Sequence, residues 1–324
     1  MKTPLPVRLA AVAAAGLVLA LLPFRLSGYH QGLAVQVAVY FLAVLGLNIV
    51  LGYTGQVSIG QGGFMAIGGY TLAIASHDRH WSVLATLPLA VAITFAIGVA
   101  FGLPALRLSG HSLAKATIAL AISVPQLTYK FSKFTGGENG IQTSQQLSHT
   151  WLYAVSWSCA ALALALAWML LRGRTGRAFR SIRDNPLAAA SSGVSLRIYK
   201  TLAFGVSAAY AGLAGALFVL ATNGFATPGQ FGLFLSIKIL IGAVVGGLGS
   251  LWGVLLGAAF VGLMPTVSTS VPVIGTAHGE NVVFGLAVIL IILLFPSGVA
   301  GVSARIPAWA RLDRSGSRGV ASET

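Results

Sequence analysis

The sequence contains few charged residues. Of its 324 residues 8% are charged and 56% are hydrophobic, and the mean hydropathy is +0.86. Soluble domains carry about 25% charged residues, so this chain cannot cover a globular surface with hydrated side chains. The composition excludes a water-soluble enzyme and predicts an all-α, polytopic integral membrane protein.

Acidic residues are the scarcest charged group. There are six, against twenty Lys and Arg, and the net charge is +14. Ion-driven transporters and proton pumps keep carboxylates or histidines at membrane depth to bind the coupling ion. None of the six lies in the middle of an apolar run: Asp78, Glu138, Asp184, Glu280, Asp313 and Glu323. The sequence therefore predicts no site for a coupling ion.

Sites for metals, nucleotides and catalysis are also missing. The single cysteine, Cys159, excludes an intrachain disulfide and a thiolate metal site. His77 and His80 lie three residues apart, but Arg79 between them favours a solvated turn over a metal site. No P-loop or hydrolase motif is present. We expect no catalytic residue, no metal and no cofactor bound by this chain.

The hydrophobic residues are gathered in long runs. A membrane-spanning helix needs about 20 mostly apolar residues, and the chain offers about ten such runs in one domain, residues 1–324. The runs are 9–24, 33–51, 55–76, 82–103, 112–129, 151–171, 201–221, 232–249, 252–271 and 281–295. Lys2 and Arg8 before the first run resemble a secretory signal, but no small-residue cleavage site follows, which favours an uncleaved first span.

The basic residues are distributed unevenly between the two sides of these spans. Fifteen fall on one side and four on the other, while Lys238 lies within a span. These basic residues lie in loops. Membrane topology and contact with anionic lipid headgroups explain their excess better than binding of nucleic acid does. The positive-inside rule therefore places both termini and residues 172–200 in the cytoplasm, and residues 302–324 form a basic, disordered cytoplasmic tail. For Lys238 we favour snorkelling or a helix contact over attraction of a substrate carboxylate.

Glycine is abundant, with 40 residues, and is concentrated in two segments. In the first, polar and glycine residues interrupt an apolar stretch: Asn48, Gly52, Tyr53, Thr54, Gly55, Gln56, Ser58 and Gln61. Unwound backbone at membrane depth persists only where it faces protein or a water-filled cavity. We favour lining of a solute pathway here, and close packing around a short re-entrant turn is the alternative. In the second segment Gly246, Gly249, Gly253 and Gly257 predict a small-residue ridge for helix packing.

The cytoplasmic segment, residues 172–200, predicts two helices separated by a break. Arg177, Arg180 and Arg183 share one helix face, and Arg180 with Asp184 is a favourable pair.

Asn185 is a good N-cap, Pro186 suits the first helical position, and Gly193 is a natural stop. Between them Leu187, Ala188 and Ala189 give a short helix with almost no charge, which is poorly stable alone. We expect it to dock in a groove of a partner, and a loop lying on lipid headgroups is the alternative.

Four motifs resemble those of the LivM-type permeases of branched-chain amino acid ABC importers. They are GLNIVLGYTGQVSIGQ (46–61), FTGGENGI (134–141), RTGRAFRSIRDNPLAAA (174–190) and GGLGSLWG (246–253), and the resemblance runs from about residue 33 to 301. The cytoplasmic segment is similar to the coupling loop of ABC importers. Leu187 departs from that loop, because a glutamate is usual there.

The resemblance implies a bacterial inner-membrane subunit with several partners. These are a sister permease, two cytoplasmic ATPase subunits that use ATP, and a periplasmic solute-binding protein. The implied function is import of branched-chain amino acids or related polar solutes by alternating access. Urea and short-chain amide importers use the same kind of permease, and an ATP-independent channel is a weaker alternative.

Overall fold

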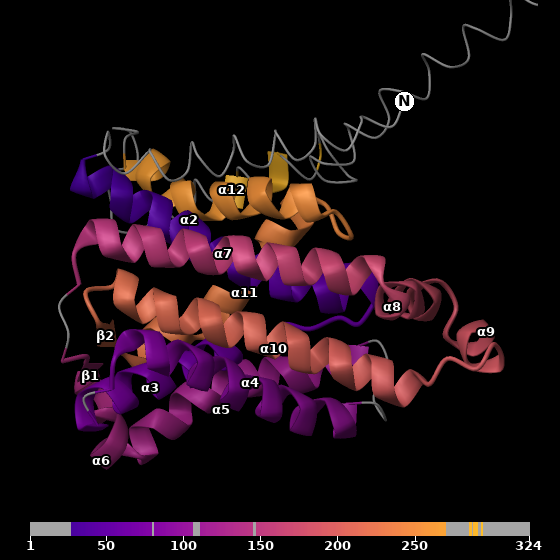
Figure 1. Ribbon diagram of the computed structural model, residues 1–324, viewed down its shortest axis with the longest axis horizontal. Helices are drawn as coiled ribbons and strands as arrows, with labels where there is room; N and C mark the ends of the chain where they lie inside the picture. Colours follow the sequence, from indigo (N-terminus) through magenta and orange to yellow (C-terminus); the bar gives the residue numbers. More distant parts are fainter. Residues whose placement is uncertain are drawn as a thin grey trace, which may run out of the picture.

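A computed structural model describes residues 27–79, 81–105, 111–144 and 147–269, with a few positions between 285 and 293 (Figure 1). The predicted span 9–24, most of the span 281–295 and the tail 302–324 lie outside the described residues.

The described chain is almost entirely helical. The long helices are α2 (Gly28–Leu47), α3 (Gln61–Arg79), α4 (Val83–Ala105), α5 (His111–Lys130), α7 (His149–Arg172), α10 (Leu196–Ala221), α11 (Leu233–Gly246) and α12 (Leu251–Thr269). A π-helical turn, η2 (Asn48–Tyr53), continues α2. The shorter elements are α6 (Ser132–Thr135), η3 (Gly137–Asn139), α8 (Arg174–Asp184), α9 (Pro186–Ser191) and η4 (Pro228–Phe231).

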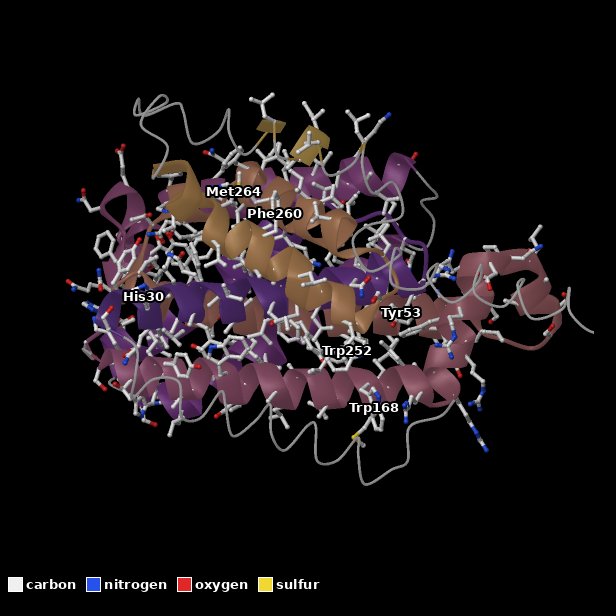
Figure 2. The ribbon with its side chains drawn as sticks, turned by 90° about the horizontal axis from the view of Figure 1, so that it is seen from above. His30, Tyr53, Trp168, Trp252, Phe260 and Met264 are labelled. Atoms are coloured by element: carbon white, nitrogen blue, oxygen red, sulfur yellow. The ribbon has the colours of Figure 1, made fainter. Side chains whose placement is uncertain are left out.

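Helices α2 and α10 form the centre of the bundle and pack against each other. α10 also packs against α3 and α4, while α2 packs against α7 and α12 (Figure 1). Both central helices bury mainly Val, Leu, Ala and Phe, so apolar packing surrounds them on most sides. His30 and Tyr53 lie toward opposite ends of the bundle, which shows that α2 and η2 together run along its length (Figure 2).

The two ends of the bundle differ in structure. At one end α8 and α9 project beyond the long helices (Figure 1). At the other end two short antiparallel strands, β1 (Ile141–Gln142) and β2 (Phe225–Ala226), pair with the register Ile141 to Ala226 and Gln142 to Phe225. These strands join the connection after α5 to the connection after α10.

Five helical segments of the described chain are long and apolar enough to cross a membrane. They are Gly28–Tyr53, Val83–Pro104, His149–Arg172, Leu196–Ala221 and Pro228–Gly246, and the apolar part of α12, Leu251–Met264, is shorter. The all-α membrane class is therefore supported, whereas the count of about ten spans is not confirmed. The third predicted span starts too early, because residues 55–60 are not helical and α3 begins only at Gln61.

Candidate functional site

The first glycine-rich segment contains the π-helical turn η2, which follows α2, and the non-helical residues 54–60 after it. The Thr54 hydroxyl donates to the Val50 carbonyl at 2.5 Å, and the Gln56 amide donates to the Thr54 hydroxyl at 2.8 Å. The Val50 carbonyl also accepts from the Gln56 backbone N–H at 3.1 Å. Side chains thus satisfy backbone groups that the end of a helix leaves without partners.

Asn48 connects this helix end to the turn between α11 and α12. Its Oδ1 accepts from the Gly249 N–H at 2.8 Å, and its Nδ2 donates to the Ser250 carbonyl at 3.1 Å. Gly52 lies against the same turn, since a methyl group on it would approach the Gly249 nitrogen to 2.5 Å. The segments that the sequence marked separately as glycine-rich therefore meet at one place.

Most of the predicted pathway residues lie inside the chain. Asn48, Tyr53, Thr54, Gln56, Ser58 and Gln61 are all buried, whereas Gly55 is exposed. The Gln61 amide donates to the Ser207 hydroxyl of α10 at 2.8 Å, and the Ile59 N–H donates to the Thr117 hydroxyl of α5 at 2.9 Å. Their interaction with solute stays a prediction.

The second glycine-rich segment makes a tight contact between α11 and α12. A methyl group on Gly246 would overlap the Gly253 carbonyl oxygen, and one on Gly257 would overlap the Gly242 carbonyl oxygen. The predicted ridge is wrong in one member. Gly249 lies in the turn before α12 with a φ of +80°, so it is not part of the helix surface.

Helix α8 projects beyond the long helices, but one of its faces packs on the bundle. Phe179 and Ile182 are buried, and Phe179 makes an edge contact with the Tyr199 ring of α10 at 6.3 Å between centroids. Arg177 on this helix is exposed. The two apolar anchors fix which face of α8 turns away from the membrane helices.

The predicted pairing of Arg180 with Asp184 is wrong. Arg183 Nε contacts the Asp184 carboxylate at 3.3 Å, and Arg180 instead donates to the Leu171 carbonyl near the end of α7 at 3.4 Å. The last carbonyls of a helix lack intrahelical partners, so Arg180 is better satisfied at the end of α7 than by an exposed carboxylate.

Helix α9 has the predicted ends. The Asn185 side chain accepts from the Leu187 and Ala188 N–H groups at 3.0 and 3.1 Å, and Pro186 occupies the first helical position. Gly193 has a φ of +83°, and the Val194 N–H donates to the Ala189 carbonyl at 3.0 Å, which closes a Schellman motif. The N-cap and the glycine stop are confirmed.

The faces of α9 are unequal. Leu187 is 83% exposed, whereas Ala189 is 3% exposed and faces the rest of the chain. A leucine this exposed at the tip of a projecting helix is an apolar surface without a partner in the described chain.

Sequence reasoning missed a polar face on α5. Apart from Ile122, Leu127 and Tyr129, the exposed residues described along this helix recur every three or four positions: Ser112, Lys115, Ala119, Ser123, Gln126 and Lys130. This spacing places them on one stripe, which the exposed apolar residues Ile122 and Leu127 flank. The sequence pattern that could have predicted this face is the recurrence of small and polar residues every three or four positions within an apolar run.

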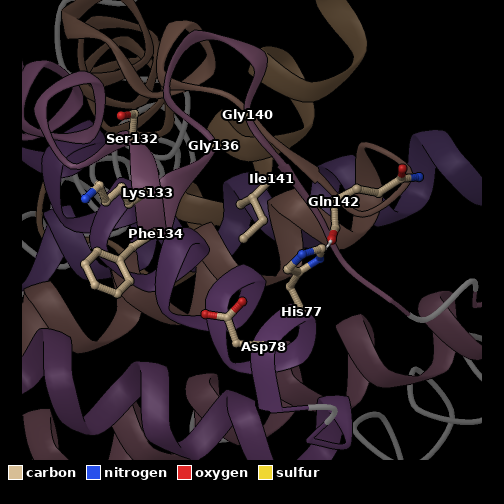
Figure 3. A pocket seen from close by; sticks show the side chains of 9 residues that line it. All are labelled: His77, Asp78, Ser132, Lys133, Phe134, Gly136, Gly140, Ile141 and Gln142. Atoms are coloured by element: carbon tan, nitrogen blue, oxygen red, sulfur yellow. Dashed lines mark hydrogen bonds between the residues drawn. The ribbon is translucent and has the colours of Figure 1, made fainter.

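A pocket of about 220 Å³ lies at the end that carries the strands (Figure 3). His77, Asp78, Ser132, Lys133, Phe134, Gly136, Gly140, Ile141 and Gln142 line it. His77 Nδ1 donates to the Gln142 carbonyl at 3.0 Å, which engages this ring with the backbone. No group of three or more metal-ligating residues occurs in the described chain, and His80 lies outside it.

Lys238 lies on α11 and is half-buried. Its ammonium is 4.9 Å from the centre of the Phe234 ring, one turn toward the start of the same helix. This cation–π contact accords with an ammonium that reaches along its helix toward one end of the bundle.

Comparisons with known proteins identify relatives for most of this chain. The LivM permease protein of the high-affinity branched-chain amino acid transport system of Escherichia coli (strain K12) is 35% identical over 267 residues, which cover 73% of this chain and 63% of the relative. LivH of the same system is 26% identical over 285 residues, 81% of this chain and 91% of the relative. The chain therefore spans less than two thirds of the LivM relative.

A more distant relative has another substrate in its name. The autoinducer 2 import system permease protein LsrC of Salmonella paratyphi B is 29% identical over 205 residues, 61% of this chain and 56% of the relative. No solved structure matches the chain. The family model described as the permease component of branched-chain amino acid transport systems matches residues 29–295, and the chain belongs to this permease family.

Proposed function

We propose that this chain is the permease subunit of an ATP-binding-cassette importer in a bacterial inner membrane. It moves branched-chain amino acids or related small polar solutes by alternating access and performs no catalysis itself. Its partners are a sister permease, two cytoplasmic ATPase subunits that hydrolyse ATP, and a periplasmic solute-binding protein. The relatives named as LivM and LivH support this assembly, because they are permeases of one transport system.

The projecting helix α9 carries the proposal. It is capped at both ends and presents an apolar tip at Leu187, which is 83% exposed. Burial of a leucine side chain stabilises a complex by about 1.5–3 kcal/mol. A short helix that is ordered and apolar but held away from the bundle suits a groove on an ATPase subunit.

The polar stripe on α5 supports a solute pathway. A polar helix face at membrane depth is unfavourable against lipid, so it must face water or another protein. Ser123 lies seven residues from the end of this helix, about 10 Å, where its short side chain cannot reach either end. We assign this stripe to the wall of the pathway, at the junction with the sister permease. The segment 55–60 packs on the opposite, buried face of α5 through Thr117.

We infer the orientation from the distribution of basic residues. The end with α8 and α9 is rich in arginine, and the Arg172 guanidinium stacks over the Trp168 ring at 3.8 Å. Basic side chains are in excess on the cytoplasmic side of a membrane, whereas tryptophan is enriched at both interfaces and marks only a boundary. The strand end, with the pocket around His77 and Asp78, then faces the periplasm and the binding protein.

Co-purification with the ATPase subunits tests the proposal. Replacement of Leu187 by Lys places a charge in the proposed apolar contact, and we expect recovery of the ATPases to fall by about tenfold or more. Leu187→Met keeps the volume and apolar character, so it serves as the matched control. Ala189 is unsuitable for this test, because it is buried against the chain itself.

Transport completes the test. The complex in proteoliposomes should import leucine, isoleucine or valine only with ATP and binding protein. ATP-dependent uptake of urea or short amides instead would change the solute that we propose but would still support the importer function. Solute flux through the purified chain alone, without ATP, would indicate a channel and contradict the proposal.

A further inference from the structure

One side chain connects α8 to the end of the central helix. Arg183 Nη1 donates to the Gly52 carbonyl oxygen at 2.8 Å, across 131 residues of sequence. Gly52 belongs to the π-helical turn that ends the segment Gly28–Tyr53, which is the most buried of the membrane-spanning candidates in the described chain. A residue of the cytoplasmic segment therefore contacts the interior helix directly.

The contact suits the chemistry of a helix end. The last carbonyls of a helix have no intrahelical partner, and this end carries a partial negative charge. The Val50 carbonyl accepts from Thr54 and Gln56, and the Leu51 carbonyl accepts from Gly55. The guanidinium of Arg183 supplies both a donor and a positive charge to the next carbonyl, that of Gly52.

Arg183 also lies against two other segments. A methyl group on Gly249 would be 3.2 Å from its Nη1, and one on Gly55 would be 3.1 Å from its Cγ. Its Nε contacts the Asp184 carboxylate at 3.3 Å. The side chain thus contacts α8, the end of η2 and the turn between α11 and α12, while 41% of it stays exposed.

We propose that Arg183 is a positioning residue that links the α8–α9 unit to the end of the central helix. When a bound ATPase displaces α9, Arg183 moves the Gly52 end of η2 with it. Asn48 passes the displacement on, because its amide holds the turn before α12 through two hydrogen bonds. This inference rests on the proposed function, since it identifies the residue that connects the ATPase-binding α8–α9 unit to the central membrane helix of the proposed importer.

The test measures coupling separately from assembly. The full complex with ATPases, sister permease and binding protein is reconstituted in proteoliposomes, and radiolabelled leucine imported per ATP hydrolysed is measured. Arg183→Met should leave the recovered ATPase and its hydrolysis in place, whereas leucine imported per ATP falls at least about fivefold, the lower end of usual coupling between sites. A purely structural role would lower ATPase recovery and uptake together and leave the ratio unchanged.

Two further variants make the result decisive. Arg183→Lys keeps the charge, but its single nitrogen does not reproduce the two separate donors, Nη1 toward the Gly52 carbonyl and Nε toward Asp184, so the ratio should lie between wild type and Arg183→Met. Arg197→Met removes an equally charged residue from the exposed first turn of α10 and should match wild type.

A wild-type ratio in Arg183→Met overturns the inference. If that variant fails to assemble, Arg183→Lys decides, and a wild-type ratio in the lysine variant overturns it. A wild-type complex without ATP-dependent uptake contradicts the proposed function itself, before any variant is compared.

Discussion

Asn48 and Gly249 are hydrogen-bonded at 2.8 Å although 201 residues separate them in the chain. The same Asn48 amide donates to the Ser250 carbonyl at 3.1 Å, so one side chain satisfies an N–H and a C=O of a single turn. The side chain is 1% exposed, which keeps water from replacing it. The turn between α11 and α12 is therefore held by the end of α2.

Asn48→Ala should destabilise the protein by about 1–3 kcal/mol, because it leaves two part-buried backbone groups without their side-chain partner. Unfolding of the purified chain in detergent measures the loss. Asn139→Ala removes the same amide from an exposed position and should change stability by less than about 0.5 kcal/mol. Equal stabilities of the two variants would contradict the role of Asn48.

Gly246→Ala should destabilise the contact between α11 and α12. The added methyl group would overlap the Gly253 carbonyl oxygen, and backbone atoms would have to shift at a cost of about 1–3 kcal/mol. Gly32→Ala is the matched control, because it adds the same group to a helix with nothing within 4 Å. Alanine at position 32 should be neutral or stabilising, since it favours the helix over glycine by about 1 kcal/mol. The measurement is again unfolding in detergent.

Asn185→Ala should weaken recovery of the ATPase subunits without touching the apolar tip of α9. The variant loses the cap to the Leu187 and Ala188 N–H groups, which stabilises a helix by about 1 kcal/mol. Asn185→Ser keeps a capping oxygen and should bind like wild type. If the alanine and serine variants bind equally well, the folded state of α9 is not what the ATPase recognises.

Cysteine labelling should distinguish water from lipid beside α5. In a chain with Cys159 replaced by Ala, cysteines at Ser123 and Gln126 should react with a charged, water-soluble thiol reagent, because the stripe borders an aqueous pathway. A cysteine at Ala121, which is 0% exposed on the same helix, should not react.

A second control distinguishes exposure at the surface of the chain from contact with water. Leu162 on α7 is 62% exposed, and its exposed neighbours on that face, Leu166 and Met169, are apolar, so we expect this face to contact lipid. A cysteine there should stay unreactive although Leu162 is exposed like Ser123 and Gln126. Labelling at Leu162 as fast as at Gln126 would remove the reason to place the pathway along α5.

Local features of the fold could be predicted from the sequence. The predicted run 151–171 corresponds to α7 (His149–Arg172), because apolar runs report spans directly. The run 201–221 ends where α10 ends but starts five residues late, since Arg197 and Lys200 extend the helix beyond its apolar part. The Asn185 cap also follows from sequence, because cap and helix are adjacent in the chain.

Contacts between distant segments could not be predicted. Arg180 and Arg183 lie on the same face of the predicted helix, so the sequence alone does not show which of them contacts another segment. The hydrogen bond from Arg183 to the Gly52 carbonyl depends on where the end of η2 lies in the folded chain. The two-residue strands are too short to show an alternating pattern. Gly249 continues the four-residue spacing of the glycines, but the turn before α12 breaks that register.

The small sheet of β1 and β2 has a consequence for motion. Ile141 and Gln142 pair with Ala226 and Phe225, and the Thr143 N–H extends this pairing by donating to the Gly224 carbonyl at 2.8 Å. The connections after α5 and α10 thus cannot separate unless backbone hydrogen bonds break. A rearrangement that preserves the sheet keeps these two connections together, so any separation of α5 from α10 has to be larger at the opposite ends of the two helices.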